Sequence, residues 1–152
     1  MLQTKDSTAT ALLPDRRTPP PARHAAPALV AELADADDFK RLAGRQAVRY
    51  RREGQVLSVL SLQVQFDSPP DPALAERLLA ECARRLCSRV RATDCVARWQ
   101  GTHFGVLLPR CEPVQAEAVL ARLTRFAGGN YRLDDLLLHV SVHGQALGAA
   151  IP

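Results

Sequence analysis

The sequence predicts a single α/β domain, of the α+β kind, with a mainly antiparallel central sheet flanked by helices. Apolar runs rich in Val and Leu, typical of strands, occur at residues 56–66 and 136–142. Segments with apolar residues at helical spacing separate these runs. Between two further short apolar runs lies the turn segment Gln100-Gly101-Thr102-His103, which predicts a hairpin. Strands separated by helices, with one hairpin among them, favour this architecture.

The first expected helix begins at about residue 28 or residue 37 and ends at Glu53, because Gly54 terminates it. Residues 56–66 follow as a central strand. Asp71 is suited to cap the next helix, and Pro72 to occupy its first turn. The apolar stripe expected on that second helix comprises Leu74, Leu78, Cys82, Leu86 and Val90.

Residues 95–99 and 104–108 are expected to pair as the hairpin. A third helix should begin at Glu112 or Pro113 and end at Gly128-Gly129. Residues 136–142 are the last expected strand. The residues of the third helix expected to face inward are Val114, Val119, Leu123 and Phe126.

Composition limits the class of protein. The 152 residues, 47% of them hydrophobic, suffice for one domain with a core. Residues 1–28 contain five prolines and are expected to be a disordered Pro-rich tail, with the domain at 29–152. Because there is no long apolar run and no signal-peptide pattern, we expect no membrane insertion and a cytoplasmic location.

The net charge of +4 comes from 18 Arg and 2 Lys against 16 acidic residues. Arginine suits the recognition of phosphate and of guanine edges. Nucleic acid is not an expected partner, because only 5% of the residues are aromatic and no contiguous basic stripe is present. Four cysteines, without a Cys-x-x-Cys pair or zinc-spaced His, are expected to be free thiols: Cys82, Cys87, Cys95 and Cys111.

The predicted hairpin carries the most informative motif. Ala97-Arg98 precedes the turn, and Phe104 begins an apolar run that ends in Leu-Leu-Pro. This frame resembles the signature hairpin of the GGDEF domain, the diguanylate cyclase module, whose turn reads Gly-Gly-Asp/Glu-Glu-Phe. The resemblance extends over about residues 37–147, including the run from Phe39 to Arg51-Arg52-Glu53-Gly54. It implies a palm-like GGDEF/nucleotidyl cyclase fold.

The acidic positions of the family are replaced. Active members hold two Mg²⁺ ions with acids at the end of the first strand and in the turn. By resemblance these positions are Gln63 and Gln65 in the strand, and Thr102 and His103 in the turn. Magnesium prefers anionic oxygen ligands, and imidazole binds it poorly. We therefore expect no magnesium, no other metal and no cyclase activity. The degenerate signature positions are Gln100, Gly101, Thr102, His103 and Phe104.

Two further family features are missing. Residues 67–71 lack the Asn and Lys of the family's guanine-binding segment, and the family's last helix has no counterpart before Pro152. His103, His139 and His143 are candidate metal ligands, but nothing in the sequence places them together, which favours ordinary exposed histidines. Trp99 is suited either to packing in the hairpin or to stacking on a base.

One family site is retained. Arg91-Ala92-Thr93-Asp94 is an Arg-x-x-Asp motif, and five residues separate Asp94 from Gln100, the first turn position. By resemblance this is the inhibitory site for cyclic di-GMP. Arg can donate to guanine O6 and N7 or to phosphate, Asp can accept from guanine N1 and N2, and Arg98 and Arg89 are near enough in sequence to add phosphate contacts.

The motif by itself is weak evidence, because Arg132 and Asp135 form a second copy outside the family position. A structural alternative is a salt bridge of Asp94 with Arg91 or Arg98. The first functional hypothesis is an inactive GGDEF-like receptor for cyclic di-GMP, without other cofactors, that regulates an unidentified protein partner. The resemblance connects such receptors with exopolysaccharide secretion, motility and biofilm formation, and it is compatible with a homodimer. The alternatives are an interaction module that binds no nucleotide and, third, a residual cyclase.

Overall fold

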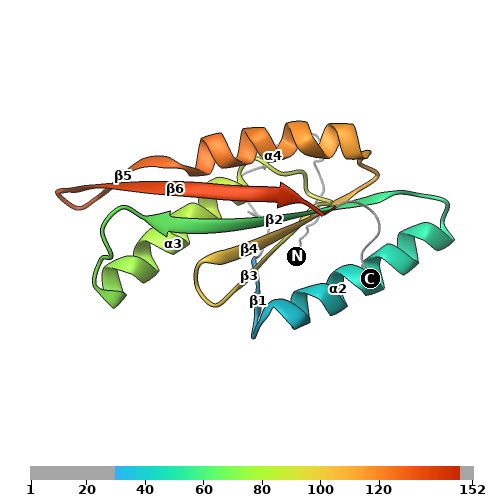
Figure 1. Cartoon of the computed structure of the whole chain (residues 1–152), viewed down its shortest axis with the longest axis horizontal. Helices are drawn as coiled ribbons and strands as arrows, with labels where there is room; N and C mark the ends of the chain where they lie inside the picture. The colour runs from blue at the N-terminus through green and yellow to red at the C-terminus, as the bar shows by residue number, and fades with distance from the viewer. Residues whose placement is uncertain (1–29, 148–152) are drawn as a thin grey trace, which may run out of the picture.

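The structure is a computed structural model that describes residues 30–147, so the predicted tail at residues 1–28 lies outside this range. Six strands form one sheet in the order β1-β3-β4-β2-β6-β5 (Figure 1). β1 pairs parallel to β3, and the remaining neighbours pair antiparallel. The strands are β1 (Val30–Leu33), β2 (Leu57–Phe66), β3 (Cys95–Trp99), β4 (His103–Pro109), β5 (Gly129–Leu133) and β6 (Leu136–Ala146).

Within residues 30–147, three helices flank the sheet: α2 (Ala36–Arg52), α3 (Pro72–Cys87) and α4 (Pro113–Ala127). Side-chain caps explain where α2 and α3 begin. Asp35 accepts from the Asp38 N–H at 2.9 Å, and Asp71 accepts from the Leu74 N–H at 2.8 Å. Figure 1 shows α4 and α2 on opposite sides of the sheet. Between residues 30 and 147, no helix is long and apolar enough to span a bilayer.

The core has two layers because β2 alternates its side chains between the two faces of the sheet. Leu60 and Leu62 face α3 and α4, where they join Phe104 and the other members of the larger apolar cluster. Leu57 and Val59 face α2, which closes a smaller cluster over them. α2 covers only this end of its face, and further along β2 the side chains of Gln63 and Gln65 are exposed.

The predicted fold class is confirmed, with corrections to individual elements. The first helix begins at Ala36, so the option of residue 28 was wrong, because residues 30–33 form β1. β1 and β5 were not predicted. Val114 was expected to face inward but is 83% exposed, because the buried face of α4 is formed by Ala116, Leu120, Leu123 and Ala127. The second helix ends at Cys87, before Val90.

The turn between β5 and β6 is attached to α3 by one exposed ion pair. Arg77 Nη1 lies 2.9 Å from Asp134 Oδ2, and the hydrogen bond and charge of Arg77 lower the pKa of Asp134. A lowered carboxylate pKa adds stability above the ordinary pKa of the group, and this stability is lost as the pH falls through the lowered value. We expect the Asp134 carboxyl to titrate below an ordinary aspartate in an NMR pH titration and to return toward the ordinary value in Arg77→Ala. An unchanged Asp134 titration in that variant would contradict the pairing.

Candidate functional site

The turn between β3 and β4 keeps the backbone of a glycine-rich hairpin. Gln100 has φ 55° and Gly101 has φ 76°. A side chain in this left-handed region costs on the order of 1 kcal/mol, and glycine avoids that cost. The turn therefore adopts a conformation suited to two glycines, although its first glycine position is occupied by Gln100.

A buried arginine fixes this turn. Arg98 Nη2 donates to both carboxylate oxygens of Glu76 on α3, at 2.8 and 2.9 Å, and its Nε donates to the Gly101 carbonyl at 3.0 Å. The Arg98 side chain is only 8% exposed. Arg98 was expected to contact phosphate beside Arg91, but the structure instead uses it to hold the turn against α3.

The positions aligned with the family's acids lie together on the sheet. Gln63 on β2 is the register partner of His103 on β4, and Gln65 lies two residues further along the same exposed face. Phe104 points into the core and is fully buried. Gln63 and His103 border a hollow of about 250 Å³, and its lining contains no carboxylate: Ser61, Leu62, Gln63, His103, His143, Gly144 and Gln145.

This hollow does not fit the two magnesium ions of an active cyclase. Its oxygen ligands are neutral amides and a hydroxyl, whereas Mg²⁺ sites that carry triphosphates are built with carboxylates. Within residues 30–147, no group of three or more His, Cys, Asp or Glu side chains could hold a metal ion.

Arg91 and Asp94 form a closed local clamp in the loop before β3. Asp94 Oδ2 accepts from the Arg91 backbone N–H at 2.7 Å, and Oδ1 accepts from Arg91 Nη2 at 2.8 Å. Arg91 Nη2 also donates to the Pro109 carbonyl at 2.7 Å. The Asp94 side chain is 3% exposed, whereas that of Arg91 is 51% exposed. The hydrogen bonding of the Arg91 guanidinium to the Asp94 carboxylate is the main reason why the pKa of Arg91 is raised.

Two arginines that the sequence analysis missed join Arg91 and Asp94. Arg110, after β4, and Arg122, on α4, line a cavity of about 210 Å³ together with that pair. Arg110 has φ 54°, an uncommon conformation for a residue with a side chain. Neither residue belongs to a recognisable motif, because their proximity to Arg91 arises only when α4 packs beside the end of β4.

Arg89 lies next to this cavity. Its guanidinium stacks over the Phe126 ring at 3.7 Å, and its carbonyl accepts from Arg122 Nη2 at 3.4 Å. The structure thus brings Arg89, Arg91 and Asp94 together at one end of the sheet. It leaves Arg98 at the other end of β3.

The cysteines are free, as predicted: Cys82, Cys87, Cys95 and Cys111. Burial raises the pKa of each of these thiols. Cys111 lines the arginine cavity, but its side chain belongs to the core. Thiols with raised pKa values are poor nucleophiles at neutral pH, so none of them is a candidate for nucleophilic catalysis.

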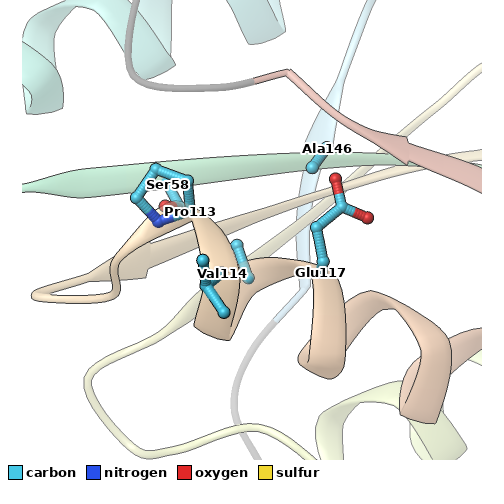
Figure 2. Close-up of a pocket in the computed structure, with 6 residues that line it drawn as sticks. Ser58, Pro113, Val114, Glu117 and Ala146 are labelled. Atoms are coloured by element: carbon cyan, nitrogen blue, oxygen red, sulfur yellow. The ribbon is translucent and has the colours of Figure 1, made fainter.

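A further hollow of about 220 Å³ lies at the start of α4 (Figure 2). Pro113 and Val114 form one side of it, Ala146 of β6 lies opposite, and Glu117 brings a carboxylate to its edge. None of the predicted site residues lines it. With one acid and a largely apolar lining, it offers no set of convergent polar groups.

Comparison with known proteins shows which class of protein this chain resembles. The family model described as "Diguanylate cyclase, GGDEF domain" matches residues 73–141. No curated protein sequence matches the chain. A sensory box/GGDEF family protein from Caulobacter crescentus has a TM-score of 0.61 at 21% identity, over 75% of this chain and 80% of that one. The family model covers less than half of this chain, so the match and the shared fold show that the chain is similar to GGDEF domains.

Two further solved structures share the fold. The diguanylate cyclase SiaD from Pseudomonas aeruginosa, in complex with its activator SiaC, has a TM-score of 0.57 at 24% identity, over 72% of this chain. The alignment covers only 44% of the SiaD chain. The coiled coil and GGDEF domain of DgcB from Caulobacter crescentus, in complex with c-di-GMP, has a TM-score of 0.54 at 13% identity, over 79% of this chain and 66% of that one.

Proposed function

We propose that this chain is a GGDEF domain that is catalytically inactive and acts as a cyclic di-GMP receptor that regulates a partner protein. One observation carries the proposal: Arg91, Arg110 and Arg122 converge on one cavity beside the retained Arg-x-x-Asp motif. The only acid lining this cavity, Asp94, is already paired with Arg91. The cavity therefore has an excess of positive charge, which suits a ligand with two phosphodiester groups.

We infer a role for Asp94 that differs from the predicted contact with guanine. Both of its carboxylate oxygens accept hydrogen bonds from Arg91. Asp94 is therefore a positioning residue that orients the Arg91 guanidinium, rather than an acceptor for guanine N1 and N2. The cavity of about 210 Å³ holds part of a dinucleotide, and the remainder would extend over the surface beside Arg89 and Phe126.

The lack of activity is proposed from the neutral lining of the hollow at Gln63 and His103. Without anionic ligands, two metal ions cannot be assembled around the triphosphate of GTP. Regulation through a partner is supported by the solved relatives, since SiaD is described with its activator and DgcB with c-di-GMP. The alternative, an interaction module without a nucleotide, is supported by the closed Arg91–Asp94 clamp.

Calorimetric titration with cyclic di-GMP tests the receptor. We expect saturable binding by the full chain and its loss in the Arg91→Ala, Asp94→Ala double variant. The second Arg-x-x-Asp copy supplies the matched control, because Arg132 and Asp135 are exposed and lie on the β5–β6 hairpin. Arg132→Ala, Asp135→Ala should bind as the unchanged protein does.

Because Asp94 is buried, the first double variant also weakens the fold. Arg110→Ala, Arg122→Ala removes two exposed side chains and should leave thermal unfolding unchanged. We expect it to weaken binding by at least tenfold, since a hydrogen bond to a charged group contributes about 1.5–3 kcal/mol. If no form of the protein binds cyclic di-GMP, the remaining function is an interaction module without a nucleotide. Conversion of GTP to cyclic di-GMP in the presence of Mg²⁺ would refute the proposed lack of activity.

A further inference from the structure

Two histidines flank one glutamine across three neighbouring strands. Gln63 on β2 is the register partner of His103 on β4 and of His143 on β6. Register partners project from the same face of a sheet, so the three side chains share one face. All three border the hollow of about 250 Å³. The folded sheet therefore brings together two imidazoles that lie forty residues apart in the chain.

The spacing suits one ion between the rings. Partner Cα atoms in antiparallel strands lie about 4.5–5.5 Å apart, so His103 and His143 are separated by about 10 Å. Two imidazoles that lean toward the central strand can both reach an ion above Gln63. Its side-chain carbonyl is then a third donor, and Gln145 adds a neighbouring amide.

Two side-chain contacts restrain the ring of His103. Its ring stacks on Trp99 with centroids 5.8 Å apart and an interplanar angle of 21°. Its Nδ1 lies 3.4 Å from the Thr102 hydroxyl. When Nδ1 carries the proton toward that oxygen, Nε2 keeps its lone pair for a metal, and contacts of this kind orient the histidine ligands of metal sites.

We propose that His103, His143 and Gln63 bind a divalent transition-metal ion of the class that prefers imidazole, Zn²⁺ or Cu²⁺, and not Mg²⁺. Imidazole nitrogen suits Zn²⁺ and Cu²⁺, whereas Mg²⁺ selects anionic oxygen, which this hollow lacks. With two imidazoles and one amide, the site is weaker than a structural zinc site with four ligands. The proposal is independent of the arginine cavity, which shares none of these residues.

The chain provides its own reporter and its own control. Trp99 is the only tryptophan and stacks directly on His103, so Cu²⁺ bound there should quench its fluorescence. His139 lies on the same face of β6 as His143, but its Nδ1 is within 3.1 Å of the Asn130 side chain and it does not border the hollow. His139→Ala is therefore the matched control for His143→Ala.

The experiment is a Cu²⁺ titration of the full chain, followed by Trp99 fluorescence. We expect saturable quenching that Zn²⁺ reverses by competition and that millimolar Mg²⁺ leaves unchanged. His103→Ala and His143→Ala should each raise the half-saturating Cu²⁺ concentration at least tenfold, and His139→Ala should change it less than twofold. Circular dichroism confirms that each variant is folded. Non-saturating quenching, equal quenching in His143→Ala, or competition by Mg²⁺ would overturn the proposal.

Discussion

Gly105→Ala is expected to destabilise the protein by about 1–3 kcal/mol through overpacking. Gly105 lies in β4, where the ring of Phe39 from α2 lies directly over its backbone. A Cβ at this position would overlap three ring carbons of Phe39. The ring cannot move away easily, because it stacks on Trp99 with centroids 4.8 Å apart. Chemical denaturation followed by circular dichroism measures the loss.

Two controls separate overpacking from the general effect of a glycine substitution. Gly44 lies in α2, and a Cβ there meets nothing within 4 Å. Gly44→Ala should therefore stabilise the protein by up to about 1 kcal/mol, because alanine favours the helix. Phe39→Ala removes the ring, so in that background Gly105→Ala should cost close to nothing. An equal cost of Gly105→Ala in both backgrounds would show that Phe39 is not the obstacle.

The strongly patterned elements were predictable from the sequence, whereas the sheet edges were not. Helices with Asp caps and ten residues of alternating β2 carry enough local signal to be recognised. β1 has four residues, and its parallel partner β3 lies more than sixty residues later, so its formation depends on tertiary pairing. β5 follows Gly128 at the end of α4 without a separating loop. The two glycines there were interpreted only as the end of the helix, so the strand was not predicted.

The candidate site was predictable only where a motif identified it. Arg91 and Asp94 were found by their position before the turn, but the burial of Asp94 was not visible in the sequence. Arg110 and Arg122 come together with Arg91 through the packing of α4, and no local pattern marks them. Arg98 was misplaced because proximity along a strand does not indicate proximity in space. A turn at residues 92–93 and then strand β3 lie between Arg91 and Arg98, so Arg98 reaches the far end of β3, beside Glu76.

Glu76→Ala is expected to cost about 1–3 kcal/mol, which is large for a residue whose side chain is 66% exposed. The cost arises at the partner, because Arg98 is 8% exposed and would keep only the Gly101 carbonyl and Glu32, whose carboxylate lies 4.0 Å away. Losing one member of a fully buried pair costs about 3–5 kcal/mol, but water reaches Glu76 and reduces the effect. Thermal and denaturant unfolding measure it.

The neighbouring residue on α3 provides the comparison. Arg77 pairs with Asp134, and both of these side chains are largely exposed, so Arg77→Ala should cost less than Glu76→Ala. Arg98→Met removes the buried charge while keeping the bulk of the side chain. In that background Glu76→Ala should change the free energy of unfolding very little. If the cost of Glu76→Ala persists there, Glu76 stabilises α3 itself. If it disappears, the guanidinium that holds the Gln100-Gly101 turn is the group that requires Glu76.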